Sequence, residues 1–160
     1  MTTPTTLLEM LAPLAERIGA LDLTDASRAE QALRDALGPQ DRTRLESMLL
    51  DARRGGWLTP KEGTPKGVFF GRLAKPSPAT HGFSVDAVDM EGPAAPHAHP
   101  LGEVSFCVAV EGEPRFDGRP PGWVVLPPGS HHTPTVEGGR MVIVYFLPEG
   151  AVEWGPAASY

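Results

Sequence analysis

The chain has 160 residues, enough to bury one sizeable hydrophobic core but too few for two stable domains. Its formal net charge is -6 at pH 7, with 14 lysines and arginines against 20 aspartates and glutamates. Neutralising nucleic-acid phosphates requires clustered Lys and Arg, so the composition argues against a nucleic-acid binder and favours small-molecule partners. The one cysteine, Cys107, excludes an intramolecular disulfide.

The ends and the hydropathy of the chain argue against export and membrane insertion. No apolar run approaches the length of a membrane span, and the amino terminus lacks the basic-then-apolar layout of a secretion signal. We therefore expect a cytoplasmic protein that does not enter a membrane.

The first third of the chain is predicted to be helical, because its apolar residues recur at the spacing of one helical face. Thr6 and Glu9 form a possible capping box for the first helix, and a second helix is predicted to start at Thr24. The predicted inward-facing residues are Leu7, Leu8, Leu11, Leu14, Ala15 and Ile18, then Ala29, Leu33, Ala36 and Leu37, and in a third helix Leu45, Met48, Leu49 and Ala52. Gly55 and Gly56 end the helical region.

From Gly67 onward, short apolar runs are separated by Gly and Pro, a pattern typical of a sandwich or barrel. The predicted strands span 67–73, 83–90, 103–110, 122–126 and 141–147. We therefore predict a helical region, 1–56, that packs on the barrel or on a dimer partner, and a β-barrel, 57–160.

The densest cluster of potential metal ligands lies in the segment 96–103, which contains His97, His99 and Glu103. Pro100 favours extended geometry at His99, and in an extended segment residues two apart face the same side. The imidazoles of His97 and His99 are therefore predicted to project together and to bind one ion.

Glu103 opens a predicted strand whose two faces differ in size. One face carries Glu103, Ser105, Cys107 and Ala109, and the other carries Val104, Phe106, Val108 and Val110. The face with small side chains leaves room for a ligand inside a barrel, while the bulky face suits packing against helices or a neighbouring subunit.

A second cluster, the segment 127–134, contains His131 and His132 after a predicted strand and a tight turn. One of these two histidines is expected to complete the site. Three neutral imidazoles and one carboxylate suit Fe, Mn, Co, Ni or Zn and leave coordination positions open for water or substrate.

These residues resemble the two motifs of the cupin superfamily. The first motif corresponds to Gly92, His97, His99, Glu103 and Gly112, and the second to Gly122, Pro127, Gly129 and His132. The ligand spacings are intact, although some glycine spacings differ by one or two residues and Val136 stands where the family often has Asn. The resemblance implies a mainly β fold, a single cupin barrel of the double-stranded β-helix or jelly-roll type with an N-terminal helical region. It also implies that His132, not His131, is the ligand, and that the protein is a homodimer.

Further segments resemble 4-hydroxylaminobenzoate lyases. They are Gly56 to Thr59, Gly67 to Pro76, Arg115 to Gly118, Gly122 to Val125 and Leu147 to Gly150. This resemblance implies a metal-dependent lyase that converts an aromatic hydroxylamine such as 4-hydroxylaminobenzoate to 3,4-dihydroxybenzoate and ammonia. The implied partner is a small aromatic carboxylate, and the implied cofactor is a divalent metal ion.

Three arginines are candidates to hold the substrate carboxylate through bidentate hydrogen bonds, namely Arg72, Arg115 and Arg119, with Arg72 as the first choice. Tyr145 lies on the opposite strand face from Val144 and is either an inward-pointing proton donor or a core residue. Glu103 is either a ligand only or also a general base. Cys107 and Trp123 are interpreted as packing residues rather than as a nucleophile and a stacking platform.

Two other functions fit the same residues. A cupin dioxygenase could use three histidines and one glutamate to activate oxygen on a catecholic or enediol substrate. A noncatalytic cupin could bind a small aromatic acid or a metal without turnover. Oxygen consumption distinguishes the first from a lyase, and saturable binding without turnover distinguishes the second.

Overall fold

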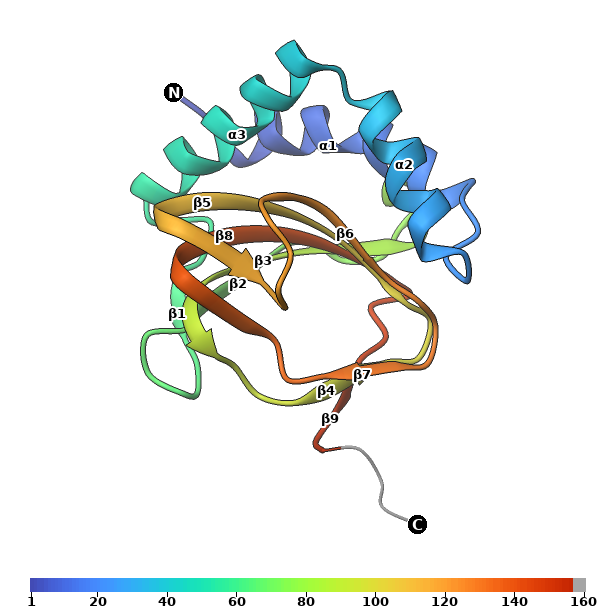
Figure 1. Cartoon of the computed structure of the whole chain (residues 1–160). Coiled ribbons are helices and arrows are strands. Elements are labelled where there is room, and N and C mark those ends of the chain that lie inside the picture. The colour runs from blue at the N-terminus through green and yellow to red at the C-terminus, as the bar shows by residue number, and fades with distance from the viewer. Residues whose placement is uncertain (157–160) are drawn as a thin grey trace.

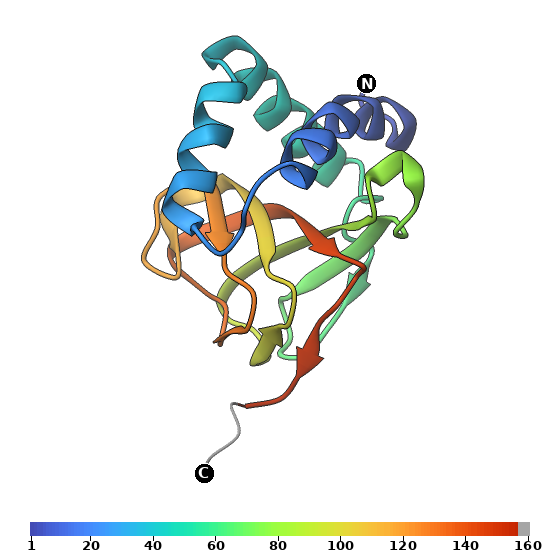
Figure 2. The same ribbon diagram turned by 90° about the vertical axis from the view of Figure 1, so that its right-hand side faces the viewer.

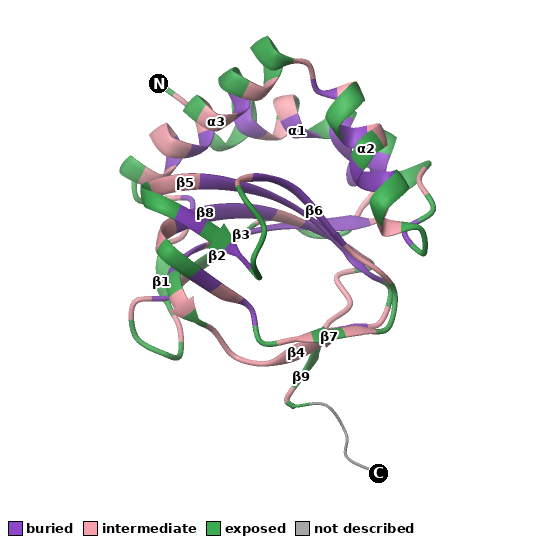
Figure 3. Cartoon of the chain, viewed as in Figure 1, coloured by how far each residue is buried: buried purple, intermediate pink, exposed green. Residues whose placement is uncertain are grey.

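Three helices cover one face of a β-sheet in the computed structural model, which describes residues 1–156 (Figure 1). They are α1 (Pro4–Gly19), α2 (Ala26–Ala36) and α3 (Pro39–Arg54). The predicted inward-facing residues are buried except Leu8, Ala36 and Met48, which are partly buried. Figure 3 shows the same pattern, with buried segments toward the sheet and exposed segments outward. The prediction of helices in the first third of the chain is therefore confirmed.

The start of α1 differs from the prediction. Thr3, not Thr6, is the N-cap residue, and its hydroxyl oxygen accepts a hydrogen bond from the Thr6 N–H at 3.2 Å. The Thr6 hydroxyl oxygen in turn accepts the Thr3 N–H at 2.9 Å. The predicted Thr6–Glu9 capping box is wrong because Pro4 already occupies the first helical turn, where its missing N–H costs nothing.

Residues 57–156 are mainly β-structure. The strands are β1 (Lys61–Glu62), β2 (Phe69–Ala74), β3 (Phe83–Pro93), β4 (His97–His99), β5 (Glu103–Phe116), β6 (Gly122–Leu126), β7 (Ser130–His132), β8 (Thr135–Pro148) and β9 (Glu153–Trp154), with one 3₁₀ turn, η1 (Pro78–Thr80). All five predicted strands are present, and three of them are longer than predicted. The two-residue and three-residue strands are too short to give a periodic signal.

The strands form two sheets that face each other (Figures 1 and 2), and residues of both sheets line a cavity between them. One has six strands in the order β1-β2-β3-β8-β5-β6, and the other has three in the order β7-β4-β9. The two sheets are not joined into one closed hydrogen-bonded barrel among residues 1–156. The expected mainly β fold with N-terminal helices is confirmed.

The six-stranded sheet separates two clusters of buried residues. The bulky face of β5 contributes Val104, Phe106 and Val108 to the cluster that includes the three helices. Cys107 lies in the other cluster, on the cavity side. The predicted alternation of β5 is therefore confirmed, and the bulky face packs on helices of the same chain.

Because helices and sheet share one apolar cluster, they do not have separate cores. The division of the chain at residue 56 stays a prediction about folding units. No helix within residues 1–156 has the length and apolar character that crossing a membrane requires.

Two glycines let the long strands β5 and β8 bend toward the three-stranded sheet. Gly112 and Gly139 are opposite each other in the β5–β8 pairing. A Cβ on Gly112 would lie 2.4 Å from the Gly138 carbonyl oxygen, and Gly112 has φ +72°. Only glycine tolerates both this close approach and this backbone conformation without strain. The bend carries the end of β5 and the start of β8 to the site described below.

A buried carboxylate joins α2 to the sheet. Glu30 is 5% exposed and accepts hydrogen bonds from the Val125 N–H at 3.0 Å and from Arg119 Nη2 at 2.5 Å. Glu30 follows Ala29, which was predicted to face inward. The sequence periodicity did not predict that the charged Glu30 would also be buried. The glutamate satisfies a backbone N–H of β6 that the helix would otherwise shield from water.

Replacing Glu30 by alanine should destabilise the fold by about 1–3 kcal/mol, because the buried Val125 N–H loses its acceptor. Urea denaturation followed by circular dichroism measures the change. The matched control is Glu16→Ala, which removes an exposed glutamate from α1 and should leave the midpoint unchanged. Equal midpoints for the wild type and Glu30→Ala would contradict the assigned role.

Candidate metal centre and ligand cavity

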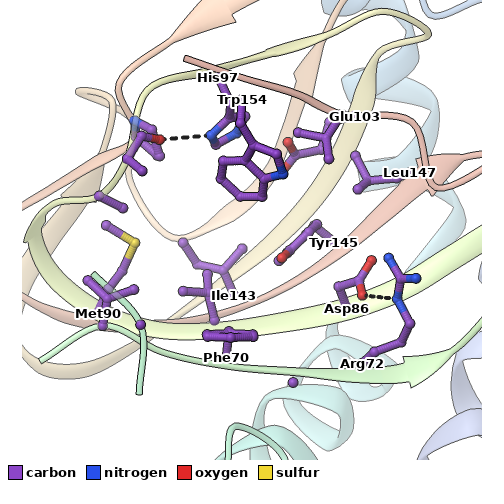
Figure 4. A pocket seen from close by; sticks show the side chains of 18 of the residues that line it. Phe70, Arg72, Asp86, Met90, His97, Glu103, Ile143, Tyr145, Leu147 and Trp154 are labelled. Atoms are coloured by element: carbon purple, nitrogen blue, oxygen red, sulfur yellow. Dashed lines mark hydrogen bonds and ion pairs between the residues drawn. The ribbon is translucent and has the colours of Figure 1, made fainter. Parts of the chain in front are cut away.

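The two sheets enclose a cavity of about 720 Å³. This volume is within the range of small-molecule sites. Its apolar lining includes Val68, Phe70, Val88, Met90, Phe116, Ile143, Leu147, Val152 and Trp154. Its polar lining includes Lys61, Arg72, Asp86, His97, His99, Glu103, His132 and Tyr145. The wall is thus mostly apolar, with charged groups at a few positions (Figure 4).

Four of the polar residues converge on one point. Strand pairing places His97 on β4 opposite His132 on β7, and His99 lies two residues along β4 on the same side. The three Nε2 atoms are 3.0–3.1 Å apart, and Glu103 Oε2 lies 2.5 Å from His99 Nε2. One ligand atom from each of the four residues lies within 4.8 Å of every other. The structure thus brings together the four predicted ligands.

Two of the imidazoles have a fixed tautomer. His97 Nδ1 lies 2.9 Å from the Ala95 carbonyl oxygen, and His132 Nδ1 lies 2.7 Å from Asp117 Oδ2. Both partners only accept hydrogen bonds, so each Nδ1 carries the proton and each Nε2 presents a lone pair. Burial, chiefly, and the neighbouring imidazoles hold the pKa of His97 below its ordinary value, against the contact with the Ala95 carbonyl. His97 therefore stays neutral, as a metal ligand must.

The donor set fits a divalent metal ion. The lone pairs on His97 Nε2 and His132 Nε2, which lie 3.1 Å apart, repel one another unless a cation lies between them. Two nitrogens at right angles around an ion, each about 2.1 Å from it, are about 3.0 Å apart. The three Nε2 atoms have the spacing of ligands on one face of an octahedron, so these residues could hold a metal ion with positions left for other ligands.

Glu103 is held in one orientation at this cluster. It is buried, and the Ser105 hydroxyl donates a hydrogen bond to Oε1 at 2.5 Å while Oε2 faces His99. Burial by itself would raise the pKa of Glu103, but the contact with His99 and the Ser105 hydrogen bond bring it below the ordinary value. The carboxylate therefore remains ionised in a buried place.

A row of polar side chains crosses the six-stranded sheet on the cavity side. Arg72 on β2 is opposite Asp86 on β3, Asp86 is opposite Tyr145 on β8, and Tyr145 is opposite Ser105 on β5. Residues opposite each other in adjacent strands share a face, so these side chains all face the cavity. Glu103, two residues before Ser105, faces the same way. The row thus leads from Arg72 to the metal-ligand cluster.

Arg72 is fixed by a buried acid. Its Nε donates to Asp86 Oδ1 at 2.7 Å, and Asp86 also accepts from the Ser84 hydroxyl at 2.7 Å. The hydrogen bond from Arg72 raises the pKa of the guanidinium. No other residue within 1–156 accepts a hydrogen bond from its two Nη groups, and the side chain is 48% exposed at the cavity. Arg72 can therefore present two donors to an anion.

Tyr145 lies between the Asp86–Arg72 pair and Glu103 (Figure 4). Burial, and the negative charges of Asp86 and Glu103, raise the pKa of its hydroxyl far above the ordinary value. Tyr145 therefore keeps its proton and can donate a hydrogen bond into the cavity, which favours the first of its two predicted roles.

Other residues weighed from the sequence lie away from the cavity lining. Arg119 pairs with Glu30, and Arg115 donates to the Gly118 carbonyl oxygen at 3.3 Å. His131 is exposed, with Nε2 3.0 Å from the Gly155 carbonyl oxygen. Trp123 is buried against Phe106, with ring centroids 5.0 Å apart. These positions agree with the packing role predicted for Trp123.

Cys107 lies buried in the cluster of apolar residues on the cavity side of the sheet. Burial raises the pKa of its thiol well above the ordinary value. A protonated, buried thiol is a poor nucleophile, which agrees with the packing role predicted for it.

Sequence reasoning missed four residues of the site. Asp117 was not singled out as a site residue, although its carboxylate accepts a hydrogen bond from His132. Asp86 was missed because its partner, Arg72, lies on another strand. Lys61 and Trp154 were missed because they lie in strands of two residues, which are too short to give a periodic pattern. Trp154, although 71% exposed, lines the cavity beside His97, with ring centroids 5.1 Å apart.

Comparison with known proteins identifies the family. The family model for 4-hydroxylaminobenzoate lyase (PnbB) matches residues 12–154. The chain belongs to this lyase family. A 4-hydroxylaminobenzoate lyase from Nocardioides sp. (strain LMS-CY) is 29% identical over 165 residues, covering 96% of each chain. One from Pseudomonas putida is 26% identical over 151 residues, covering 83% of this chain and 86% of that protein.

Among solved structures, an RmlC-like cupin protein from Ralstonia eutropha JMP134 matches with a TM-score of 0.43 and 14% identity. The match covers 60% of this chain and 68% of that one.

In this member of the lyase family, we expect His99→Ala to lose bound metal while the fold persists, because one of the four converging ligands is removed. Inductively coupled plasma mass spectrometry of purified protein gives the metal content, and circular dichroism checks the fold. The matched control is His131→Ala, which removes an exposed histidine outside the cluster and should keep the wild-type metal content. Unchanged metal in His99→Ala would disprove the site assignment.

Proposed function

We propose that the chain is a metal-dependent lyase that converts an aromatic hydroxylamine such as 4-hydroxylaminobenzoate to 3,4-dihydroxybenzoate and ammonia. One observation carries the proposal: a single cavity is lined both by a four-residue metal-ligand cluster and by an arginine with free donors. An anionic aromatic ring could therefore be held at one end while its nitrogen substituent reacts at the other. Membership of the lyase family supports the same substrate class.

The proposed reaction needs no external oxidant. One water molecule is taken up overall. The N–O bond, the C–N bond and one ring C–H bond break, and two C–O bonds form on the ring. The nitrogen is reduced from hydroxylamine to ammonia while the ring is oxidised to a catechol, so the electrons balance within the substrate and water. This balance separates a lyase from an oxygen-consuming cupin.

We assign the metal ligands as His97, His99, Glu103 and His132, and a bound divalent ion (Fe, Mn, Co, Ni or Zn) would supply Lewis acidity toward the hydroxylamine oxygen. Of the two roles predicted for Glu103, we favour that of ligand only. Its Oε1 accepts a hydrogen bond from the Ser105 hydroxyl and its Oε2 faces the imidazoles, so each oxygen already has a partner within the cluster.

Arg72 and Tyr145 are assigned to the substrate. The two Nη groups of Arg72 would hold the ring carboxylate, with Lys61 as a second cation on the same cavity wall. Tyr145, which remains protonated, would donate from its hydroxyl to the reacting nitrogen or oxygen substituent. The apolar lining between these groups would exclude bulk water from the ring.

The expectations of a homodimer and of a cytoplasmic location stay predictions. Size-exclusion chromatography with light scattering of the purified chain tests the first of them.

Incubation of the purified protein with 4-hydroxylaminobenzoate under nitrogen should release ammonia and 3,4-dihydroxybenzoate in equal amounts. Chromatography and an ammonia assay quantify the two products, and a chelator-treated sample should form neither. Absence of turnover would reject this substrate. Turnover that requires and consumes oxygen would instead favour a dioxygenase, and saturable binding without turnover would favour a noncatalytic cupin.

Arg72→Ala should raise the apparent KM for 4-hydroxylaminobenzoate by about 10- to 100-fold, since a hydrogen bond to a charged group contributes about 1.5–3 kcal/mol. The KM for hydroxylaminobenzene, which lacks the carboxylate, should change little. Steady-state kinetics on both substrates measures the difference. Arg115→Ala, which removes an exposed arginine, is the matched control. Equal losses on the two substrates would reject the carboxylate-binding role.

A further inference from the structure

We infer that Asp117 is a positioning residue for the metal centre, because it holds His132 in the tautomer that presents Nε2 to the ion. The inference rests on the proposed metal site and extends it to a residue outside the predicted ligand set. Its basis is a hydrogen bond of 2.7 Å between His132 Nδ1 and Asp117 Oδ2.

The carboxylate of Asp117 is rigidly placed. Asp117 follows the last residue of β5 and has φ +49°, a left-handed conformation that Asp and Asn adopt more readily than other non-glycine residues. Its backbone N–H donates to the Thr135 carbonyl oxygen at 2.9 Å, and its Oδ1 accepts the Thr135 N–H at 2.9 Å. Backbone and side chain are thus both tied to the start of β8.

A purely structural role would not require the second oxygen. The contacts with Thr135 join β5 to β8 and use only the backbone N–H and Oδ1. Oδ2 is left for His132, whose side chain is 14% exposed. The arrangement gives each carboxylate oxygen one N–H donor, and the donor on His132 is a ring nitrogen of a proposed ligand.

The chemistry of the pair follows from the acceptor-only character of a carboxylate. Asp117 forces the proton of neutral His132 onto Nδ1, which leaves the lone pair on Nε2. That Nε2 lies 3.0 Å from His99 Nε2 and 3.1 Å from His97 Nε2. A carboxylate behind a ligating imidazole also makes the imidazole more basic and fixes its ring orientation.

The three imidazoles differ in the hydrogen-bond partner of their Nδ1 atoms. His97 is oriented by the carbonyl oxygen of Ala95, and His99 Nδ1 is buried without a hydrogen-bond partner among residues 1–156. Among residues 1–156, His132 is the only one of the three whose Nδ1 has a side-chain partner. The support of His132 can therefore be removed by a single substitution that leaves the three histidines and Glu103 in place.

Asp117→Asn is the informative change, because asparagine keeps the size and the backbone preference of aspartate but offers only one acceptor oxygen. If the amide oxygen retains the Thr135 N–H, the amide NH₂ faces His132 Nδ1. A donor there requires an acceptor on the ring, so the proton moves to Nε2 and the lone pair no longer points at the cluster. In the opposite amide orientation the NH₂ group would face the Thr135 N–H, so two hydrogen-bond donors would oppose each other.

Two measurements test the inference on the tag-free 160-residue chain. The first is a two-bond ¹H–¹⁵N correlation spectrum of metal-free protein labelled with ¹⁵N-histidine, at about pH 8, where an unperturbed imidazole is neutral. His132 is assigned by comparison with His132→Gln. The second is titration with Co²⁺ against a competing chelator. Glu137→Gln, which removes an exposed carboxylate elsewhere on β8, is the control for net charge.

We expect the wild type and Glu137→Gln to show the Nδ1–H tautomer and equal Co²⁺ affinity. Asp117→Asn should show the Nε2–H tautomer and an affinity about 10- to 100-fold weaker. Retention of the Nδ1–H tautomer, or an unchanged affinity in Asp117→Asn, would overturn the inference. Absence of Co²⁺ binding in the wild type would instead overturn the metal site, while the tautomer measurement still decides whether Asp117 controls His132.

Discussion

The register of four antiparallel strands sets the layout of the whole site. Because β2, β3, β8 and β5 pair in order, Arg72, Asp86, Tyr145 and Ser105 form one row on the cavity face. A shift of one residue in any pairing would turn that strand's polar side chain into the cluster under the helices. The apolar residues of the opposite face pack there on α1, α2 and α3, so helix packing indirectly holds the polar row in place.

The metal-ligand cluster depends on a second constraint, the pairing of two very short strands. A three-residue strand has little stability of its own, so β4 and β7 need support from the long strands. The bend at Gly112 and Gly139 brings β5 and β8 down to them, and Asp117 then joins Thr135 and His132. The scaffold of the cluster thus includes residues distant in the chain, such as Gly112 and Asp117.

The sequence predicted those parts of the site that depend on local spacing. His97 and His99 lie two apart in an extended segment, and the alternation of β5 separates Glu103 from its bulky neighbours. The missed contacts are those between strands distant in sequence, such as Asp117 with His132 and Arg72 with Asp86. Alternation gives the face of a residue but not its partner, because register is set by the fold as a whole. The burial of Glu30 on α2 was not foreseen because its partners, Arg119 and Val125, are also distant in sequence.

The charges around the cavity give a physical reason for the proposed substrate class. Arg72 and Lys61 are cationic, while Asp86, Glu103 and Asp117 are anionic at neutral pH. With a divalent ion bound, these groups would leave one net positive charge in a largely apolar enclosure. A ligand with one negative charge would balance this formal sum, whereas a neutral or doubly charged one would not. A benzoate has that charge, and because Asp86 fixes the direction of the Arg72 fork, its carboxylate would be recognised by geometry as well as by charge.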